Sequence, residues 1–125
     1  MIVADTCVWV EVLAGTSLGT IMKPRLSKLA QLIVPTMVQL ELRKWALREL
    51  REDQADEIIT AMQGAMIVPL TESLALLAAD LSREHKLSTA DAVVYATALQ
   101  HGAILLTSDK HFANLPGVEY VTKQD

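Results

Sequence analysis

Short apolar runs alternate along this chain with longer stretches of helical periodicity, and this alternation restricts its fold more than any other feature. The runs are rich in Val, Ile or Leu and are too short for helices. They predict strands at residues 1–4, 32–34, 66–70, 103–107 and 118–121. The stretches between them predict helices at residues 6–13, 24–31, 36–51, 53–64, 71–86 and 88–101. Strands that are apolar on both faces and alternate with helices predict an α/β fold, with a parallel sheet of about five strands covered on both sides.

The length of 125 residues predicts a single domain spanning residues 1–125, because a chain this short has no room for two hydrophobic cores. Hydrophobic residues make up 51% of the chain and charged residues 21%, a balance that excludes intrinsic disorder. Pro24 is expected to open its helix, since proline is tolerated in a first turn and disfavoured inside.

Cys7 is the only cysteine, which excludes an internal disulfide and a cysteine-based zinc site and favours a reducing compartment. No basic residue precedes Lys23, and no apolar run approaches the roughly 18 residues of a membrane helix. We therefore expect a cytoplasmic protein that does not bind membranes. Cys7 itself is expected to pack as a small apolar residue.

Two acidic residues directly follow predicted strands. Asp5 comes after the first strand, and Asp109 comes after the fourth, with Thr107 and Ser108 beside it. In open parallel sheets, sites form at the carboxyl ends of the strands, so both acids are expected on one rim. Each of them is also a good helix N-cap residue, and that interpretation remains open.

Two further acids lie on apolar helix faces. Asp91 falls in the first turn of a helix that is apolar almost all round, and residues 88–91 also match a capping box. Glu41 falls on the apolar stripe of its own helix, where pairing with Lys44 or Arg48 is the alternative explanation. Capping explains neither an acid on an apolar stripe nor two acids sharing one sheet edge.

Four clustered carboxylates repel one another unless a cation lies among them. The histidines of the chain, His85, His101 and His111, are not paired at metal-ligand spacing. An all-oxygen site favours a hard ion, and we therefore predict Mg²⁺ or Mn²⁺. Such ions keep several bound waters and are suited to chemistry on phosphates.

The sequence resembles the PIN-domain ribonucleases and, within them, the VapC-type toxins of toxin-antitoxin pairs. An ordered set of four motifs carries the resemblance, at residues 2–9, 38–42, 87–98 and 103–112. The resemblance implies a metal-dependent endoribonuclease that hydrolyses RNA, forms a homodimer and is inhibited by a cognate antitoxin protein. It also implies the site residues. Asp5, Glu41, Asp91 and Asp109 carry over as metal ligands, and Thr6 and Thr107 as hydroxyls that support them or hold water.

One position departs from the pattern of the family. Some members have a further acid a few residues after the fourth motif's Asp, whereas here Lys110, His111 and Phe112 follow and Asn114 is the nearest polar residue. The number of bound ions therefore stays open. In the implied reaction, water attacks the phosphodiester and leaves a 5′-phosphate and a 3′-hydroxyl.

Two other functions remain as alternatives. A receiver domain also has an acidic Mg²⁺ pocket on an α/β sheet, but Asp5 stands alone after its strand and no Asp follows the third one. A catalytically inactive module with the same fold would only bind a partner.

The acidic balance of the chain does not exclude nucleic acid. Deducting the four proposed ligands from the formal charge of −4 leaves the rest of the chain neutral. Basic residues at 43, 44, 48 and 51 share one helix, and they are either RNA contacts or ordinary surface charges. Lys110 and His111 are likewise either RNA contacts or ordinary surface charges. Five side chains are either core filler or part of a groove for an antitoxin helix; they are Met22, Met37, Met62, Met66 and Trp45.

Overall fold

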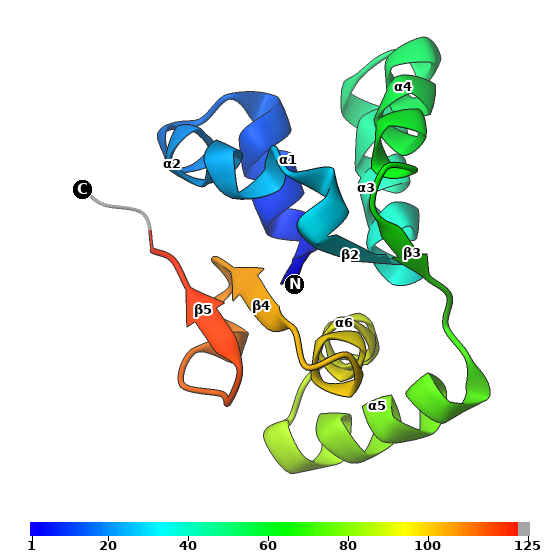
Figure 1. Ribbon diagram of the computed structural model, residues 1–125, viewed down its shortest axis with the longest axis vertical. Coiled ribbons are helices and arrows are strands. Elements are labelled where there is room, and N and C mark those ends of the chain that lie inside the picture. The colour runs from blue at the N-terminus through cyan, green and yellow to red at the C-terminus, as the bar shows by residue number, and fades with distance from the viewer. Residues whose placement is uncertain (123–125) are drawn as a thin grey trace.

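The computed structural model describes residues 1–122 and forms an α/β fold around a parallel sheet (Figure 1). The strands are β1 (Ile2–Ala4), β2 (Leu32–Pro35), β3 (Met66–Val68), β4 (Ile104–Thr107) and β5 (Val118–Tyr120). Their order in the sheet is β3-β2-β1-β4-β5, and every neighbouring pair is parallel. The predicted parallel sheet of about five strands is confirmed. A receiver domain, with its 2-1-3-4-5 strand order, is excluded.

Six α-helices connect the strands: α1 (Thr6–Ala14), α2 (Ser17–Leu26), α3 (Thr36–Glu49), α4 (Glu52–Met62), α5 (Glu72–His85) and α6 (Thr89–Gln100). Two short 3₁₀ turns, η1 (Leu29–Gln31) and η2 (Lys110–Phe112), precede β2 and β5. Figure 1 shows α1 to α4 above the sheet and α5 and α6 below it. This arrangement follows from right-handed crossovers, because the chain moves one way from β1 to β3 and then returns across the sheet to β4.

The direction of the connections therefore changes between β1 and β4, which are neighbours in the sheet. Ligand sites in open parallel sheets lie at such a switch point, beyond the carboxyl ends of the strands. Ala4 pairs in register with Leu106, so the segments that follow these two strands emerge side by side. Asp5 begins one of these segments, and Thr107 and Asp109 belong to the other.

The helix expected at residues 24–31 is wrong. Helix α2 begins at Ser17, because the Thr16 side chain accepts a hydrogen bond from the Gly19 backbone N–H at 3.0 Å and caps the helix. Pro24 therefore lies inside α2 rather than at its start. The helix ends two residues later, at Leu26.

Helix α6 forms the centre of the core below the sheet. Seven successive residues, 92 to 98, are buried, so this helix has no solvated face. The Tyr95 hydroxyl donates a hydrogen bond to the Pro116 carbonyl at 2.6 Å and fixes the loop before β5. Among residues 1–122, no helix is both long and apolar enough to cross a bilayer.

Candidate metal centre

Asp5 is the first acid of the site and is almost completely buried, with 5% of its surface exposed. It caps α1, since its Oδ1 accepts a hydrogen bond from the Thr6 N–H at 2.9 Å. The capping interpretation is therefore correct for one of its oxygens. The other oxygen, Oδ2, accepts hydrogen bonds from the Thr107 hydroxyl at 2.8 Å and from the Cys7 thiol at 3.5 Å.

The burial of Asp5 has an electrostatic consequence. Loss of solvent raises its pKa to about 6, against the opposing effect of hydrogen bonds from Thr107 and Thr6. The nearby charge of Asp91 raises the pKa further. A carboxylate in this position is costly to ionise without a cation close to it.

Thr107 is the last residue of β4 and Asp109 lies two residues beyond it, and the buried Thr107 hydroxyl joins two parts of the site. It donates to Asp5 Oδ2, and it accepts a hydrogen bond from the Asp109 backbone N–H at 3.0 Å. Asp109 in turn caps η2, where its Oδ1 accepts a hydrogen bond from the His111 N–H at 2.9 Å. The Thr107 side chain therefore fixes Asp109 relative to Asp5.

Asp91 lies in the first turn of α6. The Ser88 hydroxyl is the cap of this helix and accepts a hydrogen bond from the Asp91 N–H at 3.2 Å. The Asp91 carboxylate does not serve as the cap. Its pKa is raised, first by burial and then by the charges of Asp109 and Glu41, while the Ser88 hydrogen bond and the charge of His111 oppose the shift. Asp91 therefore faces the other acids, as the helical projection predicts.

Glu41 reaches the same region from α3. Its Oε1 accepts a hydrogen bond from the Thr6 hydroxyl at 2.8 Å, which joins α3 to the start of α1. Its predicted alternative partners do not bind it: Arg48 pairs instead with Glu49 at 2.9 Å. Thr6 therefore positions Glu41 much as Thr107 positions Asp5.

The acids do not all meet at equal distance. Asp91, Asp109 and His111 each offer a ligand atom within 4.8 Å of the others. Asp5 and Glu41 lie outside this group. Asp5 is joined to Asp109 through the Thr107 hydroxyl, and the charge of Asp91 raises its pKa, while the charge of Glu41 raises the pKa of Asp91. The predicted acids therefore surround one region of the structure, and two of them form its tightest cluster.

The charges of these acids are not balanced by basic side chains. Within the described part of the chain, no Lys or Arg forms an ion pair with Asp5, Glu41, Asp91 or Asp109. The one basic side chain paired with them there is the imidazole of His111, whose Nδ1 lies 3.0 Å from Asp109 Oδ1. Carboxylate oxygens from several elements, with no Lys or Arg paired to them, are the ligands that a hard divalent cation takes, so these residues fit a bound Mg²⁺ or Mn²⁺.

Two residues of this site were not predicted to belong to it. His111 was considered only as an RNA contact, because no second histidine stands at ligand spacing; its two-residue offset from Asp109 is the signal that identifies it. Cys7 packs partly buried against the hydrophobic core, as expected. Its thiol also lies among polar groups, 3.6 Å from Thr107 Oγ1 and 3.3 Å from the Ser108 hydroxyl. Burial raises the pKa of the Cys7 thiol, so it is poorly reactive.

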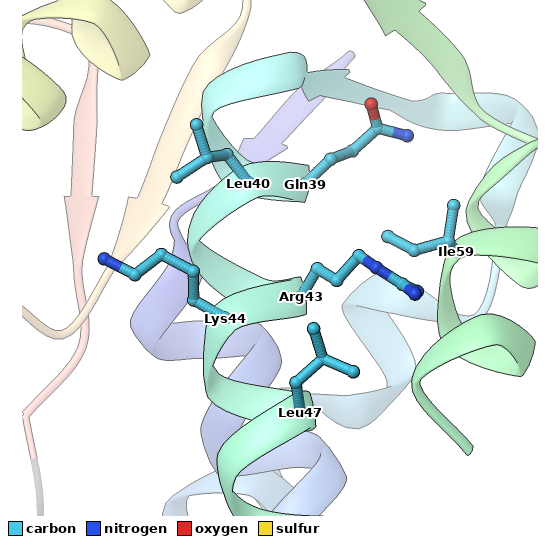
Figure 2. Close-up of a pocket in the computed structure, with 6 residues that line it drawn as sticks. All are labelled: Gln39, Leu40, Arg43, Lys44, Leu47 and Ile59. Carbon is cyan, nitrogen blue, oxygen red and sulfur yellow. The ribbon is translucent and has the colours of Figure 1, made fainter. Parts of the chain in front are cut away.

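A groove between α3 and α4 is a second surface feature, with a volume of about 490 Å³ (Figure 2). Its exposed apolar residues include Leu40 and Leu47 of α3. Figure 2 shows Arg43 extending toward α4 and Lys44 extending away from it. The three arginines at the predicted basic positions form ion pairs with acids, which favours ordinary surface charges; the pairs are Arg43–Asp56, Arg48–Glu49 and Arg51–Asp53.

The five side chains that the sequence assigns either to the core or to a groove for an antitoxin helix differ in their burial. Met22 and Met62 are buried in the core, and Met37 and Trp45 pack partly buried against it. Met66 is half-exposed at β3. None of the five lines the α3–α4 groove.

Solved structures share this fold over nearly the whole chain. A chain of a toxin-antitoxin complex from Klebsiella pneumoniae matches with a TM-score of 0.82 and 22% identity, over 95% of this chain and 96% of that one. VapC20 of Mycobacterium tuberculosis, described as a sarcin-ricin loop cleaving toxin, matches with a TM-score of 0.77 and 20% identity, over 98% and 100% of the two chains. VapBC-1 from nontypeable Haemophilus influenzae matches with a TM-score of 0.74 and 20% identity, over 98% of each chain.

The amino-acid sequence was also compared with curated proteins and with models of protein families. No curated protein matches it. The family model of the PIN domain, however, matches residues 2–118 and so includes all four acids and both threonines of the site. The chain belongs to the PIN domain family.

Proposed function

We propose that this protein is an endoribonuclease that depends on Mg²⁺ or Mn²⁺ and is the toxin of a toxin-antitoxin pair. The observation that carries the proposal is the set of acids beside the carboxyl ends of β1 and β4, which no Lys or Arg of residues 1–122 neutralises. Membership of the PIN domain family supports nuclease activity. The description of VapC20 as a toxin that cleaves the sarcin-ricin loop supports RNA as the substrate.

In the proposed mechanism, Asp5, Glu41, Asp91 and Asp109 would hold the metal. A divalent ion there supplies positive charge for the phosphate oxygens and lowers the pKa of the attacking water. Thr107 keeps Asp5 Oδ2 oriented, and the Asp109 backbone N–H keeps the Thr107 hydroxyl oriented in turn. Thr6 holds Glu41 Oε1, which leaves Oε2 to orient water or substrate.

The chemistry of the attack assigns the products. Water, rather than the ribose 2′-hydroxyl, is the nucleophile, so the P–O3′ bond breaks to leave a 3′-hydroxyl and a 5′-phosphate. None of these steps requires the 2′-hydroxyl. The preference for RNA therefore comes from substrate binding and not from the acids themselves.

We also propose a protein antitoxin as partner, and a homodimer as the active form. Structures of toxin-antitoxin complexes from several bacteria share the fold of this chain, which supports such a partner. The α3–α4 groove offers exposed Leu40 and Leu47 beside Ile59, an apolar surface suited to the nonpolar face of a helix. We assign the activity to the cytoplasm, where both RNA and an antitoxin made with the toxin are found.

The test is incubation of the purified protein with a mixed RNA pool, with chelator, with Mg²⁺ or with Mn²⁺, followed by sequencing of the new 5′ ends. We expect cleavage at defined positions in either metal, none in chelator and none with Asp91→Asn. Cleavage by the variant would place the chemistry elsewhere. If the wild-type protein binds Mn²⁺ but cuts no RNA in the pool, the inactive binding module is the correct interpretation.

A further inference from the structure

His111 stands apart from the acids of the site because it is a nitrogen donor on the same short turn as one of them. Asp109 caps η2, and His111 is the second residue of that turn. The backbone hydrogen bond from His111 to Asp109 Oδ1 fixes the spacing of the two side chains, and the imidazole Nδ1 lies 3.0 Å from the same oxygen. The imidazole therefore faces the carboxylate without any rearrangement of the turn.

The position of this nitrogen suits coordination as well as hydrogen bonding. Two neighbouring ligands of an octahedral ion with bonds of about 2.1 Å lie about 3.0 Å apart, which is the distance between Nδ1 and Asp109 Oδ1. Asp91 supplies the third ligand atom, and all three atoms lie within 4.8 Å of one another. A single ion is thus within reach of two carboxylates and one imidazole.

An ordinary surface ion pair does not account for the whole arrangement. A simple pair joins two side chains, whereas a ring nitrogen of His111 lies within 4.8 Å of carboxylate oxygens of both Asp109 and Asp91, and Asp91 comes from a different element. The side chain of His111 is 68% exposed, while that of Asp109 is only 29% exposed. The imidazole therefore lies on the solvent side of the acids, where an open metal site takes its last protein ligand.

We propose that His111 is a metal ligand through Nδ1, together with Asp91 and Asp109, and that its nitrogen biases the site toward Mn²⁺ over Mg²⁺. This inference rests on the proposed function, since it concerns the ion of the same site. Imidazole is a common ligand of transition metals, whereas Mg²⁺ is bound almost entirely by oxygen. An all-carboxylate site lacks this source of preference.

The experiment measures metal binding rather than cleavage. The full-length protein is titrated with Mn²⁺ by electron paramagnetic resonance and with Mg²⁺ by calorimetry, and pulsed measurements on the Mn²⁺ form detect coupling to a nitrogen nucleus. The variants are His111→Gln and, as a matched control, His101→Gln, whose exposed imidazole bonds the Thr97 carbonyl on its own helix. Both positions are exposed, so neither change threatens folding.

We expect nitrogen coupling in the wild type and in His101→Gln, and none in His111→Gln. The affinity for Mn²⁺ should fall about tenfold in His111→Gln, equivalent to about 1.4 kcal/mol, while the affinity for Mg²⁺ changes less than about twofold. Wild-type protein without nitrogen coupling, or an unchanged ratio of the two affinities in His111→Gln, overturns the inference and leaves His111 as a hydrogen-bond donor to Asp109.

Asp91→Asn separates this inference from the proposed function. If Asp91→Asn loses Mn²⁺ binding while His111→Gln retains wild-type affinity and coupling, only the role of His111 is wrong. If Asp91→Asn binds Mn²⁺ as tightly as the wild type, the metal site of the proposed function is wrong, and the role of His111 is overturned with it.

Discussion

The Thr107 hydroxyl donates a hydrogen bond to Asp5 Oδ2 at 2.8 Å, joining residues that are 102 positions apart in the sequence. The bond is possible because β1 and β4 are neighbours in the sheet, although two other strands, β2 and β3, come between them along the chain. It links the end of one strand to the start of the helix after the other. The acids of the site are therefore oriented by sheet topology and two threonine hydroxyls rather than by a flexible loop.

Replacing Asp5 by Asn should make the metal-free protein more stable at neutral pH. Burial raises the pKa of Asp5 above its ordinary value of 3.8 to about 6, so the folded state favours the protonated form. Asp5 therefore contributes stability below about pH 4, and this contribution is lost as the pH rises through about 6. In chelator, the free energy of unfolding of the wild type should fall by about 2 kcal/mol more than that of Asp5→Asn between pH 4 and pH 7.

Denaturant unfolding at a series of pH values checks this prediction. At pH 7 the variant should gain about 1 to 2 kcal/mol, because the altered hydrogen bond with Thr107 offsets part of the relief. RNA cleavage by the variant should be lost. Parallel pH profiles for the two proteins would mean that the Asp5 carboxylate is not strained in the fold.

Metal addition should stabilise the folded protein. An ion that binds only the folded state at 100 times its dissociation constant adds about 2.7 kcal/mol, which raises the melting temperature of a domain of this size by roughly 10 °C. Thermal melts followed by circular dichroism, with Mg²⁺, Mn²⁺ or chelator, measure the shift. Asp109→Asn should remove it, whereas Asp80→Asn, an exposed acid of α5, should retain it. Equal shifts in both variants would point to nonspecific binding.

Thr107→Val should impair the site more than its small change in volume suggests. Valine keeps the shape of the buried side chain but leaves the Asp109 backbone N–H without its acceptor and removes the hydroxyl donor of Asp5 Oδ2. The free energy of unfolding should fall by about 2 to 3 kcal/mol. The pKa of Asp5 should also rise, since the Thr107 hydrogen bond lowers it.

Thr107→Ser is the matched control, because it retains the hydroxyl and loses only a methyl group, at a cost of about 1 kcal/mol. Its affinity for Mn²⁺, measured by calorimetry, should stay near that of the wild type, while the affinity of Thr107→Val falls. Similar affinities in the two variants would show that packing, and not the hydroxyl, is what the site needs.

Gly19→Ala should destabilise the packing of α2 on α1. A Cβ atom at this position overlaps the backbone carbonyl of Glu11, which cannot move without distorting α1. The expected loss is at least about 3 kcal/mol in the free energy of unfolding. Gly102→Ala is the comparison: its Cβ meets open space, and only the positive φ of 60° opposes it, at about 1 kcal/mol. Equal losses, measured by urea unfolding, would contradict the close helix contact.

The sequence predicted the sheet and the position of its acids because the signals for these are local. Each strand is a short apolar run, and Asp5 and Asp109 directly follow two of them. The shared rim required only the rule that parallel strands end on one edge. That β1 and β4 are neighbours in the sheet could not be predicted in this way. The order of the strands depends on how the connecting helices pack on the sheet, and no single segment of the sequence determines it.

The errors have physical causes. Gly19 and Pro24 both disfavour a helix, and the tertiary contact of Gly19 with Glu11 outweighs this weak local preference in α2. The polar surroundings of Cys7 depend on Thr107 and Ser108 from the far end of the chain. The sequence does not identify His111 as a site residue, because a single histidine beside an acid on a tight turn lacks the paired spacing that predicts a histidine metal site.

Burial of seven successive residues in α6 restricts how this protein can change. Substitutions at the buried positions of this helix cannot be neutral surface changes, because each alters the packing of the core. Asp91 lies in the first turn of the same helix. Selection in living cells for inactive versions should therefore recover alterations along this helix as often as at the acids themselves, because drift there disturbs the core and the carboxylate together.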